Sequence, residues 1–123
     1  MSVEALWLVY FGDAALPALI PGYSNAGVIV LETGRLLGGD FGYYYVGKYS
    51  VVKDQELVAR ATITHFNGPL RDAFDLGLKS FEIEIGGTFS DEEMSGWMFP
   101  VGHPTRRLPI RLRRAAELPT GVA

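Results

Sequence analysis

Short runs of β-branched and aromatic residues follow one another along the chain, separated by turns that contain glycine or proline. This spacing is typical of an antiparallel all-β domain, in which hairpins join neighbouring strands. Runs of this kind cover residues 6–11, 27–32, 35–37, 43–51, 57–66, 81–85, 94–99 and 108–113. The eight strands that they predict fit an eight-stranded antiparallel up-and-down barrel, because closure removes exposed strand edges. A two-sheet sandwich is the alternative, since strand counting does not separate the two folds.

Length and composition limit both the number of domains and the classes of function. The 123 residues predict one domain over residues 1–123, and the absence of cysteine excludes a disulfide scaffold and a cysteine nucleophile. The net charge of −3 argues against a dedicated nucleic-acid binder. The sequence shows no signal-peptide pattern at its start and no apolar run as long as a membrane span. We therefore expect a cytoplasmic protein that is not embedded in a membrane.

Two segments between the expected strands depart from the hairpin pattern. Pro69 near a first helical position, the run at 70–76 and the following Gly77 predict one short helix that packs on the sheet. The long connection at residues 12–26 carries several apolar residues, which predicts a lid over the mouth of the barrel.

Alternating apolar residues predict the lining of the barrel interior. In the run at 57–66, for example, Ala61 and Ile63 share one face, whereas Thr62 lies on the other. An interior of this size is either packed or holds one small ligand, and this lining suits an apolar, elongated one. The candidate ligand-binding residues are Trp7, Val9, Phe11, Val28, Val30, Tyr43, Tyr45, Ile63, His65, Phe81, Ile83, Trp97 and Phe99. The same phase leaves Ile29 and Leu31 exposed, where they offer a dimer interface.

The reactive residue types offer one candidate for catalysis. His65 continues the inward phase of its strand near the strand end, so it could act as a base at the barrel mouth with Asp40 nearby. The simpler interpretation is a hydrogen-bonded polar residue at the rim. No Gly-x-Ser-x-Gly elbow, phosphate-binding glycine loop or metal-ligand spacing is present. The sequence therefore predicts no catalytic residue, no metal site and no cofactor.

Several motifs follow one another in a fixed order over residues 5–118. They are Leu-Trp-Leu-Val-Tyr-Phe at 6–11, Gly-Val-Ile-Val at 27–30, Gly-Arg-Leu-Leu-Gly-Gly-Asp at 34–40, Tyr-x-Gly-x-Tyr-Ser at 45–50 and Arg-Arg-x-x-Glu-Leu at 113–118. In this order and spacing the chain resembles the GrlR-type family, whose founding members are negative regulators of type III secretion.

The resemblance implies an eight-stranded, lipocalin-like (calycin-like) barrel with an apolar interior, no catalysis and homodimerisation. The founding members bind a transcriptional activator through alternating Glu and Asp residues. The matching positions here, 51–54, contain a single acid, Asp54. We expect a non-enzymatic binding or regulatory protein that binds a protein partner or a small apolar ligand. A lipocalin-like carrier without a regulatory role and an enzyme that uses His65 are the alternatives.

Overall fold

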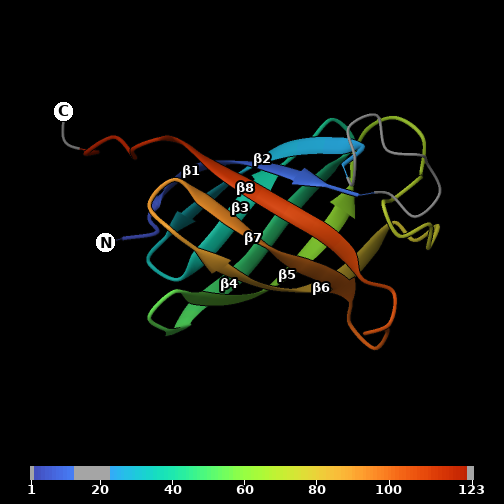
Figure 1. Ribbon diagram of the computed structural model, residues 1–123. Coiled ribbons are helices and arrows are strands. Elements are labelled where there is room, and N and C mark those ends of the chain that lie inside the picture. The colour runs from blue at the N-terminus through green and yellow to red at the C-terminus, as the bar shows by residue number, and fades with distance from the viewer. Residues whose placement is uncertain (1, 13–22, 122–123) are drawn as a thin grey trace.

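The strands form one closed barrel, because the last strand pairs with the first (Figure 1). The structure, a computed structural model, describes residues 2–12 and 23–121. Each strand pairs antiparallel with its neighbour in the chain, so the predicted eight-stranded antiparallel barrel is confirmed and the sandwich is excluded. The strands are β1 (Ala5–Phe11), β2 (Asn25–Glu32), β3 (Arg35–Gly39), β4 (Tyr43–Lys53), β5 (Glu56–His65), β6 (Ser80–Phe89), β7 (Glu93–Pro100) and β8 (Leu108–Ala116).

The alternation of side chains along each strand separates the core from the solvent-facing surface. In β5, Leu57, Ala59, Ala61 and Ile63 are buried, and the intervening residues face outward, as the sequence predicted. Inward side chains of all eight strands meet in one core, in which Trp7 is completely buried. Burial of this apolar surface is the main force that holds the strands together.

Inward-facing glycines lie where neighbouring strands approach closely. A Cβ atom on Gly47 would lie 2.1 Å from the carbonyl oxygen of Arg60, and one on Gly96 would lie 1.9 Å from that of Gly86. Real Cβ atoms essentially never come within 3.0 Å of another heavy atom in this way. These positions therefore accept no side chain unless the strands move apart.

Strand β2 has the opposite phase from the one predicted. Ile29 and Leu31 are buried, whereas Val28 is 42 % exposed and Val30 is half-buried on the outer face. The predictions that Val28 and Val30 line the interior and that Ile29 and Leu31 form an exposed interface are both wrong. All four of these residues are apolar, so hydrophobicity alone does not show which face of β2 is inward. Glu32 shows it, because its exposed carboxylate lies on the same face of the strand as Val28 and Val30.

Strand β7 also has the opposite phase from the one that the sequence predicts. Met98 is buried, whereas Trp97 is 45 % exposed and Phe99 is half-buried on the same outer face. The prediction that Trp97 and Phe99 line the interior is therefore wrong. The exposed Ser95 shares their phase and could have revealed it. The guanidinium of Arg107 lies over the Trp97 ring at 4.5 Å from its centroid, which covers part of this outward-facing apolar surface.

The predicted short helix at 70–76 is absent, and no helix in the described part of the chain could span a membrane. Residues 66–79, which we name the capping segment, run as turns and irregular chain between β5 and β6. The reason lies in Asp72, whose carboxylate accepts hydrogen bonds from the backbone N–H groups of Phe74, Leu76 and Gly77. Aspartate competes in this way with helical hydrogen bonds, and Asp75 adopts a left-handed φ of 58°, which no helix allows.

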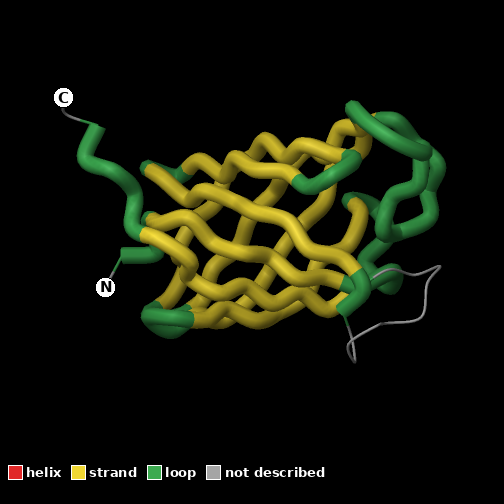
Figure 2. Tube along the Cα trace, turned by 90° about the horizontal axis from the view of Figure 1, so that it is seen from above, coloured by secondary structure: helices red, strands yellow, loops and turns green. Residues whose placement is uncertain are grey.

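The two ends of the barrel differ. Figures 1 and 2 show the capping segment at one end and the first and last described residues at the other. The lid predicted at 12–26 falls mainly on residues 13–22, which lie outside the described residues.

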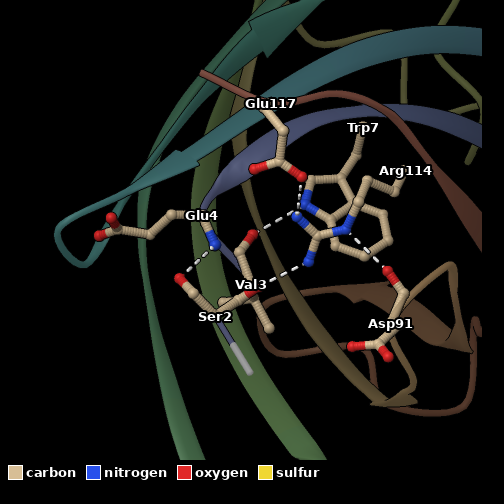
Figure 3. A network of polar contacts seen from close by, with 7 residues as sticks. All are labelled: Ser2, Val3, Glu4, Trp7, Asp91, Arg114 and Glu117. Atoms are coloured by element: carbon tan, nitrogen blue, oxygen red, sulfur yellow. Dashed lines mark hydrogen bonds and ion pairs between the residues drawn. The ribbon is translucent and has the colours of Figure 1, made fainter. Parts of the chain in front are cut away.

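Arg114 lies at the end of the barrel opposite the capping segment, next to the N-terminal residues Ser2 and Val3 (Figure 3). Its guanidinium donates hydrogen bonds to the carbonyl oxygens of Ser2, at 2.5 Å, and Asp91, at 2.7 Å. It also lies over the Trp7 ring, 5.0 Å from the centroid, while the indole N–H donates to the carbonyl of Val3 at 2.9 Å. One cation therefore ties the N-terminal segment, β8 and the β6–β7 hairpin to the buried tryptophan.

Candidate functional site

A cavity of about 70 Å³ lies inside the barrel, and inward residues of all eight strands contribute to its lining. The side chains of Val9, Ile63 and Ile83 are typical of the lining, which is predominantly apolar. Phe11 at the end of β1 and residues 72–74 of the capping segment also line the cavity. The cavity therefore belongs to the capped end of the barrel, away from Arg114.

Tyr43 brings a hydroxyl group to this apolar lining, and the hydroxyl has no hydrogen-bond partner among the described residues. The residue is 7 % exposed, and its hydroxyl is buried without a hydrogen-bond partner in the described structure. Burial raises the pKa of Tyr43, and the carboxylates of Asp72 and Asp40 raise it further. The backbone N–H of Arg71 lies near the hydroxyl and lowers the pKa, as does the Arg71 charge, but this N–H donates its hydrogen bond to the Pro69 carbonyl at 2.9 Å. The phenol therefore stays protonated at neutral pH and can donate or accept one hydrogen bond.

Tyr45, two residues along the same inward face, has its partner inside the protein. Its hydroxyl donates a hydrogen bond to the carboxylate of Asp40. Burial raises the pKa of Tyr45 well above its usual range, and the neighbouring Asp40 raises it further. The Asp40 carboxylate also accepts the backbone N–H groups of Gly42 and Tyr43, both at 2.9 Å. These bonds fix Asp40 at the rim between β3 and β4, where it lines the cavity.

Asp72 is the second carboxylate of the lining. It is 2 % exposed and is the only buried charged residue among the described residues. Its hydrogen bonds to the backbone N–H groups of Phe74, Leu76 and Gly77 are 2.9 to 3.1 Å long. They hold Phe74 over the barrel, where its ring meets Phe81 edge-on at a centroid distance of 6.3 Å. Asp72 thus both shapes the capping segment and places a negative charge at the cavity.

A second, more polar hollow of about 230 Å³ adjoins the cavity, and we name it the vestibule. It shares Phe11, Asp40, Tyr43 and Ala73 with the cavity. Its further lining residues are Asn25, Ala26, Phe41, Gly42, Asn67, Pro69 and Arg71. Tyr43 and Asp40 therefore stand where an apolar chamber meets a polar one, which is the arrangement that recognises a molecule with an apolar part and a polar part.

The structure gathers about half of the predicted interior residues around the cavity. Those that line it are Val9, Phe11, Tyr43, Tyr45, Ile63, Phe81 and Ile83. Trp7 is buried in the core but lies outside the lining, next to Arg114. The remaining predicted residues on β2 and β7 face outward, as described above.

His65 lies at the rim and does not line the cavity. Its Nε2 is 2.8 Å from the carbonyl oxygen of Gly68, so it is hydrogen-bonded within the capping segment. The ring packs edge-on against Tyr43, with a centroid distance of 5.3 Å. No group of three or more potential metal ligands occurs in the residues that the structure describes. This geometry gives His65 a role in holding the capping segment and supporting Tyr43.

Sequence reasoning missed several lining residues, for two reasons. Ile29 and Met98 were missed because the phases of their strands were inverted, and Glu32 and Ser95 carried the signal that would have corrected them. Asp72 was missed because its segment was interpreted as a helix. An aspartate followed within five residues by a glycine is also a turn pattern, and that pattern was the available signal.

Comparisons with known proteins leave the family open. No family model matches the chain, and no curated protein matches it. The resemblance to the GrlR-type family stays a prediction from the motifs that carry it.

Proposed function

We propose that the protein is a non-enzymatic binding protein whose barrel takes up a small, mostly apolar molecule that bears one hydrogen-bonding group. The observation that carries this proposal is the Tyr43 hydroxyl, which is buried without a hydrogen-bond partner among the described residues at an otherwise mainly apolar cavity. An unsatisfied buried hydroxyl costs about 1–3 kcal/mol. A ligand that hydrogen-bonds to this group removes the cost, so the unsatisfied hydroxyl favours binding.

The cavity volume limits the ligand. An engineered protein cavity of about 150 Å³ holds benzene, and the cavity here is about 70 Å³. A long lipid chain is therefore larger than the space inside the barrel, and a short alkyl group is the part that fits. The vestibule, at about 230 Å³, has room for the polar remainder of the molecule. The proposed ligand is thus a small amphiphile and not the elongated molecule expected from the sequence.

The alternative of an enzyme that uses His65 receives less support. The imidazole is engaged with Gly68 and Tyr43 and lies outside the cavity lining. A general base needs hydrogen-bond reach to its substrate, and this position does not provide it. We therefore assign no catalytic role to His65.

The biological setting that we propose is regulation by binding, as the resemblance to the GrlR-type family implies. The positions that match the activator-binding run lie in the β4–β5 hairpin, where residues 51–54 are all exposed. They comprise two valines, Lys53 and Asp54, so an acidic run is missing. Support for a regulatory role comes from the resemblance alone, and a lipocalin-like carrier shares the same ligand site.

We predict that 1-butanol binds inside the barrel. In a titration followed by methyl NMR, the cavity-lining Ile63, Ile83 and Ile110 are expected to shift, because the alkyl chain packs beside them. The Tyr43→Phe variant is expected to bind butanol up to about tenfold more weakly, the value of one neutral hydrogen bond. The same variant should unfold no more easily than the wild type, because the lost hydroxyl has no partner within the described structure.

Tyr44→Phe is the matched control for this experiment. Tyr44 is the next residue along β4, is 45 % exposed and faces outward, so its loss should leave butanol affinity unchanged. Methyl shifts confined to exposed residues such as Val58, or equal affinity in the Tyr43→Phe and wild-type proteins, would contradict the proposal.

We also propose that the protein forms a homodimer, and the outer surface of β1–β4 is the best candidate interface. Leu6, Val30, Leu37 and Val46 lie side by side in one row of cross-strand pairs, and Leu8, Val28 and Tyr44 belong to the next row. We name these seven residues the outer apolar face. None of them is charged, and contiguous apolar surface of this kind marks interaction sites. This face replaces the one that was predicted around Ile29 and Leu31.

A charge at the centre of the outer apolar face is expected to prevent dimer formation. Leu37 is 46 % exposed and lies between Val30 and Val46, so Leu37→Glu would place a carboxylate within the interface. Light scattering should give a dimer mass for the wild type and a monomer mass for this variant. Val58→Glu is the control, because Val58 is similarly exposed but lies on β5 outside the face. A monomeric wild type at high concentration would refute this interface.

A further inference from the structure

The charged side chains among the described residues of the cavity lining all have the same sign. Among the described lining residues, Asp40 and Asp72 are acidic and none is basic. Arg71 lines the vestibule but not the cavity. The guanidinium of Arg106 lies outside the lining and donates a hydrogen bond to the backbone carbonyl of Phe74, at 2.6 Å. The described side chains that line the cavity itself therefore carry negative charge only.

The charge of Asp72 is not compensated by an ion pair within the described structure. The carboxylate is 2 % exposed, and it accepts its hydrogen bonds from backbone N–H groups, which carry no net charge. None of the ion pairs among the described residues involves Asp40 or Asp72. Buried charges in proteins are normally paired, because removing an ion from water is costly. An uncompensated carboxylate at a ligand cavity therefore favours a ligand that brings the counter-charge.

Tyr43 connects this charge to the ligand position. Its hydroxyl is buried without a partner in the described structure, and the residue lines both the cavity and the vestibule. Asp40 and Asp72 line the cavity together with Tyr43, and their carboxylates raise the pKa of its hydroxyl. A ligand group that reaches the hydroxyl therefore lies beside two negative charges, whose effect is stronger in a mainly apolar surrounding than in water.

We propose that the site selects amines: a short alkyl group occupies the cavity, and a protonated amino group bonds to the Tyr43 hydroxyl in the field of Asp40 and Asp72. This inference rests on the proposed ligand-binding function and adds the charge of the ligand to it. A bare metal ion does not suit the site, because most of its lining is apolar and offers no ligands. An alkyl carboxylate of the same length is rejected by like charge.

The test compares three molecules with the same four-carbon chain: n-butylamine, 1-butanol and butyrate. Each is titrated at neutral pH and constant ionic strength, and the shifts of the cavity-lining isoleucine methyls give the affinity. We expect the amine to bind at least about tenfold more tightly than the alcohol, and butyrate to bind at least about tenfold more weakly than the alcohol. Equal affinities of amine and alcohol, or preference for butyrate, would overturn the inference while leaving the proposed function intact. Absence of binding by all three would overturn both.

Charge-removing variants locate the source of the preference. Asp72→Asn is expected to reduce the ratio of amine to alcohol affinity at least about threefold, and Asp40→Asn to reduce it in the same direction. The second variant is needed because Asp72 also holds the capping segment. In Asp40→Asn the amide oxygen can still accept the N–H groups of Gly42 and Tyr43, and the amide NH2 can donate to the hydroxyl oxygen of Tyr45. Asp75→Asn is the matched control. It removes an equal charge from an exposed position of the same segment, and asparagine tolerates the left-handed φ found there. An unchanged ratio in both Asp40 and Asp72 variants would refute the proposal.

Discussion

Trp7→Ala is expected to lower the free energy of unfolding by about 3–5 kcal/mol, the cost of removing a large aromatic side chain from a packed core. Trp7 is completely buried, and its indole N–H is bonded to the Val3 carbonyl at 2.9 Å. The substitution also removes the ring over which the Arg114 guanidinium lies. Equilibrium unfolding in urea, followed by circular dichroism, measures the loss.

Trp97→Ala is the matched control for Trp7→Ala. Trp97 is 45 % exposed on the outer face of β7 and contacts Arg107 through a cation–π interaction. Its removal is expected to cost about 1 kcal/mol or less, because little buried area is lost. Equal losses of unfolding free energy in the two variants would contradict the inward position of Trp7 on β1 and the outward position of Trp97 on β7.

Gly96→Ala is expected to destabilise the barrel by about 1–3 kcal/mol or more, as overpacking does in other cores. The added methyl group would lie 1.9 Å from the carbonyl oxygen of Gly86. That oxygen belongs to the backbone of β6, so relief requires β6 and β7 to separate and not merely a side chain to rotate. The same urea unfolding experiment measures the effect.

Gly86→Ala provides the comparison for Gly96→Ala within the same pair of strands. A Cβ atom on Gly86 meets nothing within 4 Å, so this variant should unfold within about 0.5 kcal/mol of the wild type. Equal losses of stability in the two variants would mean that the close approach at Gly96 does not cause the loss. The cause would then be a general cost of replacing glycine in a strand.

The number of strands and their pairing could be predicted because turns and alternation mark them locally. Strand β5 illustrates this, since Arg60 and Thr62 interrupt the apolar residues and fix which side faces water. The phases of β2 and β7 could not be predicted from hydrophobicity, because both faces of these strands carry large apolar residues. There the polar residues Glu32 and Ser95 hold the information. A one-residue error in phase exchanges the core with the surface.

The candidate site was predictable only in its apolar part. The aromatic residues of β4 and the alternation of β6 correctly placed Tyr43, Tyr45 and Ile83 on the inner surface. The polar part depends on residues distant in sequence, because Asp40 follows β3 whereas Asp72 lies in the capping segment. Both line the cavity because the capping segment lies over the end of the barrel, and no local sequence pattern records this. That the Tyr43 hydroxyl has no hydrogen-bond partner within residues 2–12 and 23–121 is likewise visible only in three dimensions.

The arrangement of Arg114 also has a practical consequence for studying this protein. The Arg114 guanidinium holds the carbonyl of Ser2 beside β8, and the first and last described residues lie at the end of the barrel opposite the capping segment (Figure 1). An affinity tag, a biotin or a fluorophore attached beyond these residues through a flexible linker would therefore start from the end of the barrel opposite the capping segment. Immobilisation on a sensor chip through either of these segments would therefore leave the candidate site facing the flowing sample.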